Sequence, residues 1–179
     1  MFQSVATTLP GLLVLQPRIF SDARGSFVKT FHAGFFRQLG VDFQPAEEFF
    51  SVSHKNVVRG MHFQLPPDAH AKLVYCVTGE VLDVVVDLRK SSPTFGRAAS
   101  RKLSASNREM FYIPVGVAHG FLALEDNTVM VYQTSTVHAP ASDAGIHWNS
   151  IGFDWPVTKP VLSERDQNFP KLAEFNSPF

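Results

Sequence analysis

The feature that most constrains the fold is a series of short strand-like segments between residues 72 and 134. Turns such as Thr78-Gly79 and Glu125-Asp126-Asn127 separate them. Many short strands at regular spacing predict an antiparallel sandwich or barrel. The segments are Lys72–Val77, Glu80–Leu88, Arg97–Leu103, Glu109–Ile113, Gly120–Leu124 and Val129–Thr134.

The flanking sequence adds strands and two short helices. Ala33–Leu39 predicts a short helix that Gly40 ends, and Ser163–Gln167 predicts one helical turn. We therefore expect an all-β fold with short peripheral helices, in a single domain over residues 1–179. Further strands are expected at Leu12–Pro17, Phe27–Phe31 and Phe49–His54.

Composition narrows the class of protein. Seventeen Phe residues point to a β core that buries aromatic side chains. A formal net charge of zero argues against a broad nucleic-acid surface. The single cysteine, Cys76, cannot form an intrachain disulfide, and no long apolar segment predicts a membrane span. We expect a cytoplasmic protein without a nucleic-acid or membrane partner.

Chemistry-bearing residues gather in Arg59-Gly60-Met61-His62-Phe63-Gln64 and at Lys72. A histidine can move a proton near neutral pH, while Arg and Lys can hold an anion. Together they suit an anionic substrate that loses a proton from carbon. The alternative is a core histidine flanked by two solvated cations.

Three later residues could join this group. His119 has the small neighbours Ala118 and Gly120, which leave room for a ligand beside the imidazole. Tyr132 lies in a strand, and Asp166 lies in the C-terminal helical turn. Each also has an ordinary interpretation, as a core histidine, a core tyrosine and a surface acid.

A metal site is not expected. His62 has no second histidine at metal-ligand spacing, because His70 follows eight residues later and Glu80 eighteen residues later. A first-row metal needs several converging nitrogen and oxygen ligands, which these spacings do not supply.

Motifs along nearly the whole chain resemble the dTDP-4-dehydrorhamnose 3,5-epimerase family. A single motif would not identify the family, but the number of motifs and their order along the chain are specific for it. They are Asp22-x-Arg24-Gly25-x-Phe27, Arg59-Gly60-Met61-His62-Phe63-Gln64, Lys72-Leu73-Val74, Gly79-Glu80-Val81, Asp83-Val84, Asp87-Leu88-Arg89, Ser92-Pro93-Thr94-Phe95-Gly96, Ile113-Pro114-x-Gly116-x-Ala118-His119-Gly120-Phe121, Gly145-Ile146-x-Trp148-Asn149 and Leu162-Ser163-x-x-Asp166.

The resemblance implies a cupin-type jelly-roll β barrel that works as a homodimer without metal or cofactor. It implies a nucleoside-diphosphate 4-keto-6-deoxyhexose as substrate, inverted at C3 and C5 through an enolate. His62 resembles the family's base, oriented by Asp166. Lys72 would stabilise the enolate, and Tyr132 would return a proton from the opposite face.

The resemblance also implies substrate-binding residues. His119 would line the sugar pocket, and Arg24 and Arg59 would hold the diphosphate. The rings of Phe27 and Phe121 could stack on the base or the sugar.

Three positions depart from the family pattern. Lys29 stands where most members have Glu, and Glu47 stands where a Gln is usual; both positions are associated with the nucleotide base. Uracil or cytosine therefore stay open beside thymine. His138 replaces a Tyr on the wall that faces the sugar.

Other functions remain open. The main alternative is a single-centre epimerase that acts at C3 or C5, on a dTDP-linked sugar or on another nucleotide sugar such as a CDP-linked one. A 3,4-ketoisomerase on the same barrel usually lacks the C-terminal Leu-Ser-x-x-Asp motif, which is present here. A non-catalytic sugar-binding cupin would have no reason to keep His62, Lys72, Tyr132 and Asp166 together.

Overall fold

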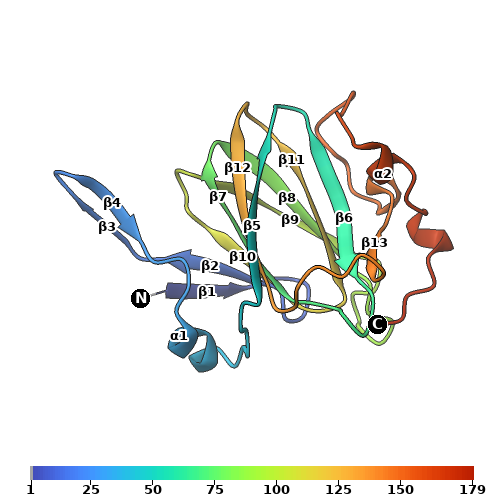
Figure 1. The fold of residues 1–179 in the computed structure, drawn as a ribbon, viewed down its shortest axis with the longest axis horizontal. Coiled ribbons are helices and arrows are strands. Elements are labelled where there is room, and N and C mark those ends of the chain that lie inside the picture. Colours follow the sequence, from blue (N-terminus) through green and yellow to red (C-terminus); the bar gives the residue numbers. More distant parts are fainter. Residues whose placement is uncertain (1) are drawn as a thin grey trace.

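The computed structural model describes residues 2–179 and consists mainly of two antiparallel sheets (Figure 1). The first sheet has the order β1 (Phe2–Ala6), β2 (Leu13–Pro17), β10 (Met110–Ile113), β7 (Lys72–Thr78), β12 (Thr128–Thr134), β5 (Glu47–Ser53). The second has the order β13 (Asp143–Gly145), β6 (Val58–Gln64), β11 (Val117–Ala123), β8 (Glu80–Asp87), β9 (Ala98–Ser104). The predicted all-β jelly roll is confirmed.

The remaining elements are small and lie outside the two sheets. Strands β3 (Ile19–Asp22) and β4 (Gly25–Val28) form a separate hairpin. The helices are α1 (Ala33–Gln38), α2 (Glu164–Gln167) and the 3-10 turns η1 (Trp148–Ser150) and η2 (Leu172–Glu174). No helix within residues 2–179 is long and apolar enough to cross a membrane.

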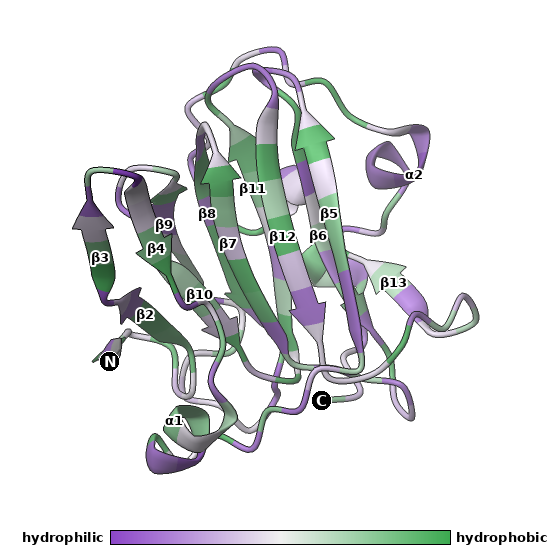
Figure 2. Cartoon of the chain, turned by 60° about the vertical axis from the view of Figure 1, so that its left-hand side comes forward, coloured by the Kyte–Doolittle hydropathy of each residue, from purple (hydrophilic) through white to green (hydrophobic). Residues whose placement is uncertain are grey.

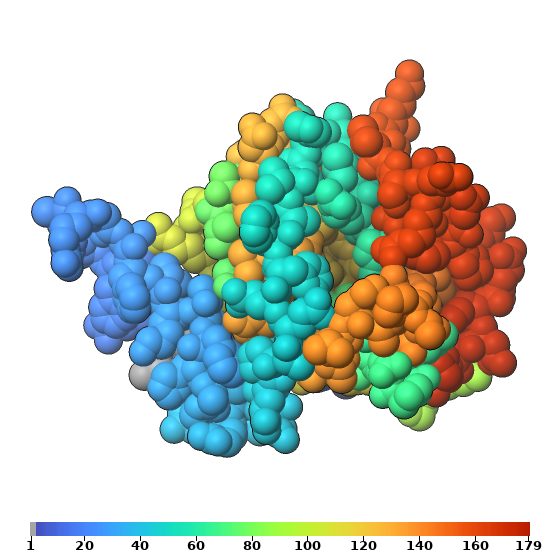
Figure 3. All heavy atoms as spheres, in the orientation of Figure 1, coloured from blue at the N-terminus to red at the C-terminus, as the bar shows by residue number. Residues whose placement is uncertain are grey.

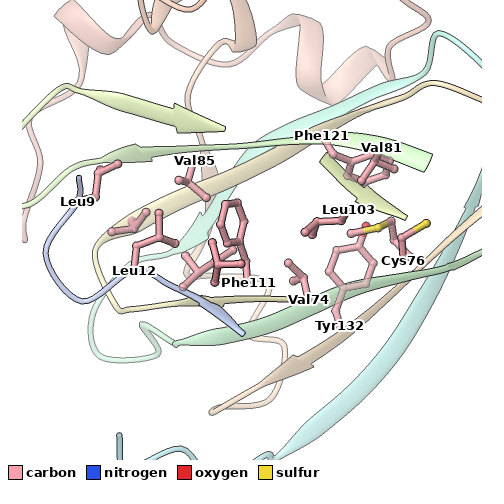
Figure 4. Packing of buried hydrophobic residues seen from close by; sticks show 14 of the residues in the cluster. Leu9, Leu12, Val74, Cys76, Val81, Val85, Leu103, Phe111, Phe121 and Tyr132 are labelled. Carbon is pink, nitrogen blue, oxygen red and sulfur yellow. The ribbon is translucent and has the colours of Figure 1, made fainter. Parts of the chain in front are cut away.

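The core lies between the sheets because side chains alternate along each strand. Val74 and Cys76 of β7 point inward beside Met130 and Tyr132 of β12. Figure 4 shows Tyr132 at one end of this cluster and Leu9 and Leu12 at the other. The many hydrophobic positions of β7, β8, β11 and β12 are visible in Figure 2.

The outer face of the first sheet carries a second apolar cluster. Leu73 and Tyr75 pack there against Phe36 of α1 and Phe43. Helix α1 is capped at its N-terminus by His32, whose side chain accepts a hydrogen bond from the backbone N–H of Phe35. The predicted helix is thus confirmed, and its apolar side anchors it to the sheet.

The sequence-based boundaries are wrong mainly near the N-terminus. Strand β1 was not predicted, and the segment expected at 27–31 instead ends at Val28 in β4. The hairpin turn between Asp22 and Gly25 sets this boundary, because it pairs Ile19 with Val28. Such pairing depends on register, which local composition does not report.

The β3–β4 hairpin projects from the body of the molecule (Figures 1 and 3). Its residues are almost all exposed, including Phe20 at 49% and Phe27 at 61%. In the described part of the chain, the Arg24 side chain forms an ion pair only with its neighbour Asp22, 2.6 Å away.

Two glycines let strands β6 and β11 approach closely. Gly60 has a φ of +133°, and a Cβ there would lie 2.5 Å from the Cα of Gly120. Side chains at these positions would push the strands apart and displace His62 from its partner strand, where it pairs with His119.

Candidate functional site

A cavity of about 340 Å³ lies between the two sheets, next to the apolar core. Eight of the predicted site residues line it: Glu47, Arg59, His62, Lys72, His119, Phe121, Tyr132 and His138. The structure therefore brings together residues that are up to 91 positions apart in sequence, as the hydrogen bond between Glu47 and His138 shows.

His62 and Asp166 form the central pair. His62 Nε2 lies 2.9 Å from Asp166 Oδ1, although the residues are 104 positions apart. The other carboxylate oxygen, Oδ2, accepts a hydrogen bond from the backbone N–H of Gly60 at 3.1 Å. Asp166 is held in place because Ser163 caps α2 and accepts its backbone N–H.

The two ring nitrogens of His62 have different surroundings. An ionised carboxylate only accepts hydrogen bonds, so in the tautomer that donates to Asp166 the proton lies on Nε2. Among residues 2–179, nothing is hydrogen-bonded to Nδ1. In this tautomer Nδ1 carries the lone pair that can accept a proton.

Burial and charge both shift the pKa values of His62 and Asp166. Burial is the main cause that lowers the pKa of His62, and Asp166 opposes it. Burial alone would raise the pKa of Asp166, but its hydrogen bonds and charge interaction with His62 lower it to about 2. At neutral pH His62 is thus a neutral base beside an ionised carboxylate.

Lys72 lies beside this base. Its Nζ donates to the backbone carbonyl of His62 at 3.2 Å. Burial lowers the pKa of Lys72 to about 8, while Asp143 and Asp83 oppose the shift. The ammonium is therefore mostly charged at pH 7 and has two further N–H groups for an oxygen anion in the cavity.

Tyr132, on β12, reaches the cavity from the sheet opposite His62. Its hydroxyl lies 3.0 Å from Ser51 Oγ, and its ring stacks on Phe49 with a centroid distance of 4.8 Å. Burial raises the pKa of Tyr132 far above its usual value, so the phenol keeps its proton. A neutral base and a protonated acid thus face one cavity from two sheets.

A second histidine–carboxylate pair lies behind the first. His119 Nε2 is 2.8 Å from Asp83 Oδ2, and both side chains are buried. The His119 ring stands edge-on to Tyr132, with 6.0 Å between the ring centroids. His119 therefore supports Tyr132 as well as lining the cavity.

Two guanidinium groups line the cavity. Arg59 is fixed to β5, where it donates to Ser53 Oγ at 3.0 Å and to the carbonyl of Val52 at 3.2 Å. Arg165 pairs with Asp143, and its Nη2 lies 3.0 Å from His62 Nε2. Cations at this cavity suit an anionic ligand.

The hairpin residues are not part of this cavity in the single chain. Arg24 and Phe27 line only a surface hollow formed by the hairpin itself, and Lys29 lies just after β4. Their predicted substrate contacts remain predictions. By contrast, Glu47 lines the cavity and accepts the backbone N–H of His138 at 2.6 Å.

Sequence reasoning missed several cavity residues. Arg165 directly precedes Asp166, and Ser51 lies two residues after Phe49 in an alternating strand, so both had a usable signal. Asp143 had none, because only the pairing of β13 with β6 brings it to the cavity. Asp83 belonged to a family motif and His70 was weighed only as a metal ligand, and neither was predicted as a site residue. Within residues 2–179, no group of three or more His, Cys, Asp or Glu side chains is arranged to hold a metal ion.

Comparison with known proteins places this site in a family. A family model described as dTDP-4-dehydrorhamnose 3,5-epimerase matches residues 6–174. A protein of that name from Shigella flexneri is 42% identical over 173 residues, which is 95% of this chain and 96% of the relative.

Solved structures agree with the sequence match. The epimerase from Legionella pneumophila in complex with dTDP-4-keto-L-rhamnose has a TM-score of 0.94 and 34% identity, covering 98% of this chain and 95% of its own. ChmJ, a 3'-monoepimerase from Streptomyces bikiniensis in complex with dTDP-quinovose, has a TM-score of 0.89 and 38% identity, covering 93% and 86%. The chain therefore belongs to the dTDP-4-dehydrorhamnose 3,5-epimerase family, and it is an isomerase.

Proposed function

We propose that the protein inverts C3 and C5 of dTDP-4-keto-6-deoxyglucose in deoxysugar biosynthesis, in the cytoplasm. The observation that carries this proposal is the placement of a neutral base, His62, and a protonated acid, Tyr132, on opposite sheets around one cavity. Inversion at carbon needs a proton removed from one face and another delivered to the other face.

The first step is proton removal beside the ketone. His62 Nδ1 accepts the proton from carbon, the C–H electron pair forms the enolate double bond, and the negative charge moves to the ketone oxygen. Lys72 donates hydrogen bonds to that oxygen and stabilises its charge. Asp166 balances the imidazolium that forms.

The second step is protonation from the opposite face. Tyr132 donates its phenolic proton to carbon, the ketone re-forms, and the configuration is inverted. Solvent then removes the proton from His62 and returns one to Tyr132, so that each centre consumes no net proton. Ser51, 3.0 Å from the phenol oxygen, can stabilise the transient phenolate with a hydrogen bond.

The nucleotide is assigned less directly. Arg59 supplies a fixed guanidinium for the diphosphate, and Phe121 and His119 lie on the cavity wall. Thymine is the base that relatives' names support, as in the Legionella pneumophila complex. Glu47 lies at the cavity, so competition binding of dTDP, UDP and CDP tests the choice of base there.

We also propose that the protein is a homodimer in which the hairpin contacts the second subunit. The hairpin carries exposed Phe20 and Phe27, and β5 exposes Phe50 at 68% and Val52 at 50%. Apolar surface of this kind is typical of an interface. A second subunit would also explain how Arg24 and Lys29, remote from the cavity of their own chain, meet substrate.

Mixing inactive variants tests shared sites. If the hairpin completes the partner's cavity, Arg24→Ala and His62→Asn subunits mixed together recover activity, because some mixed dimers have one intact site. Light scattering of the wild type gives the mass independently. A monomer mass, or no recovery in verified mixed dimers, would contradict the shared site.

The decisive experiment on activity is solvent exchange. We expect the enzyme, incubated with dTDP-4-keto-6-deoxyglucose in D₂O, to place deuterium at C3 and C5 and to invert both centres, read by NMR. His62→Asn is the matched control. Absence of deuterium at either carbon with the wild type would overturn the proposal.

A single-centre epimerase is the second candidate. The similarity to the 3'-monoepimerase ChmJ supports it, as does His138, a shorter side chain than the Tyr expected on the sugar-facing wall. Deuterium confined to one carbon after long incubation would favour it. His138→Tyr would then be the first variant to test for the second exchange.

A further inference from the structure

His70 is the feature of the cavity that the mechanism above does not use. Both its ring nitrogens are buried without a hydrogen-bond partner, and the only other such side-chain atom in the described part of the chain is Gln133 Oε1. A buried polar group without a partner is costly, so native proteins rarely keep one unless a ligand or water meets it. His70 lines the cavity with Lys72.

The backbone around His70 is fixed. The N–H of Ala71 donates to Ser135 Oγ at 2.9 Å, and the carbonyl of Ala71 accepts the N–H of Ser135 at 3.0 Å. The next residue, Lys72, begins β7 and pairs with Thr134. The backbone that carries His70 is therefore anchored next to Lys72, at that end of the cavity.

The neighbouring polar side chains have already used their hydrogen bonds. The Gln64 amide nitrogen donates to the Asp68 carbonyl at 2.8 Å, and its oxygen accepts the N–H of Ala139 at 2.7 Å. Thr134 donates its hydroxyl to the carbonyl of Thr136. At this end of the cavity, the side chains of His70, Lys72 and His138 still have nitrogen atoms that can form hydrogen bonds with a ligand.

The charge state of His70 selects the kind of ligand. Burial, followed by the positive charges of Lys72 and His138, lowers the pKa of His70 to about 3. The ring is therefore neutral at working pH, with one N–H donor and one acceptor nitrogen. A hydroxyl group, which also donates and accepts, is the matching partner; an isolated anion would meet only one donor.

We infer that His70 is a specificity-determining residue that hydrogen-bonds a hydroxyl of the sugar ring on the Lys72 side of the ketone. This inference rests on the proposed function, because Lys72 marks where the ketone oxygen lies. Both nitrogens are covered in this ring orientation, although His70 lines the cavity. A half-turn about Cβ–Cγ exchanges the nitrogens with ring carbons, and this torsion of histidine has a broad energy profile.

The test is a binding cycle between protein and sugar. Calorimetry measures the affinity of dTDP-glucose, its 2-deoxy and 3-deoxy analogues, and dTDP, for the wild type, His70→Phe and His70→Gln. We expect the wild type to lose about tenfold in affinity for one deoxy analogue, the size of one hydrogen bond. His70→Phe should bind dTDP-glucose about tenfold more weakly, bind dTDP unchanged, and no longer distinguish that analogue.

The conservative variant and a control separate specificity from structure. His70→Gln keeps a donor and an acceptor and should recover most of the discrimination, whereas the exposed His54→Phe should leave all affinities unchanged. Equal wild-type affinity for both deoxy analogues, or an equal loss for dTDP and dTDP-glucose in His70→Phe, would overturn the inference.

These binding results are independent of turnover. If the wild type exchanges no deuterium, the proposed function fails even where the binding cycle succeeds. If exchange occurs but the cycle shows no coupling to His70, only the role of His70 fails.

Discussion

The cavity contains two histidine–carboxylate pairs of almost the same geometry, and they differ in exposure. His62 lies 2.9 Å from Asp166, and His119 lies 2.8 Å from Asp83. The His62 side chain is 26% exposed, but that of His119 is 3% exposed. The two histidines are direct cross-strand partners on β6 and β11. Their exposure therefore differs although they lie on neighbouring strands.

The carboxylates show what this difference does. Asp166 receives the N–H of Gly60 in addition to His62, and its pKa is lowered to about 2. Asp83 is completely buried, and burial raises its pKa although His119 and Lys72 oppose the shift. The same pair of residue types therefore gives a poised base where the histidine is partly exposed and a structural brace where both side chains are buried.

The largest expected effect is on catalysis at the exposed pair. His62→Asn should reduce the rate of deuterium exchange by about 10²–10⁴-fold, the usual loss for a missing general base. Asp166→Asn should cause a smaller loss, because the base stays but its orientation and charge balance weaken. Near wild-type exchange in His62→Asn would show that another group is the base. Circular dichroism verifies folding.

The next effect concerns stability. Here we expect the larger loss at the buried pair, His119 and Asp83, and the smaller loss at His62 and Asp166. Among residues 2–179, His119 is the only hydrogen-bond partner of the two Asp83 oxygens. His119→Leu therefore leaves Asp83 buried without a partner and should lower the free energy of unfolding by about 3–5 kcal/mol. His62→Leu leaves Asp166 bonded to Gly60 and should cost only about 1–2 kcal/mol.

Urea denaturation of the two leucine variants measures this difference directly. Equal losses would mean that burial does not distinguish the pairs, and the comparison would fail. Because His119 also lines the cavity, exchange activity is not the readout here.

The smallest effect is on the pH profile. His62 must be neutral and burial lowers its pKa, so activity should rise with pH on the acidic side, at lower pH than an ordinary histidine would give. Lys72 must be charged, so activity should fall as pH rises through about 8. Arg165 lowers both pKa values by its positive charge, so Arg165→Met should move both limbs to higher pH.

The matched control for Arg165 is Arg37→Met, which removes an exposed guanidinium of α1 that does not line the cavity. Arg165 is half-exposed, so its loss should change the rate at pH 7 by less than tenfold. Limbs that stay in place in Arg165→Met would show that its charge does not act on His62 and Lys72.

Local sequence patterns predicted much of the fold for a physical reason. Alternation in Val129–Thr134 reports which side chains face inward, and in the structure Met130 and Tyr132 share the inward face. Helix α1 was predicted because apolar spacing and Gly40 act within a few residues. Motif order likewise identified the family, and His62, Lys72, Tyr132 and Asp166 as candidates.

Tertiary structure decided what each candidate can do. Sheet pairing placed His119 opposite His62 and buried Asp83 beneath it, so two similar histidines acquired different environments. It also left His70 without a hydrogen-bond partner and kept Arg24 away from the cavity of its own chain. Residue type and local spacing are properties of the sequence, but burial, register and distance between remote segments arise only when the two sheets pack together.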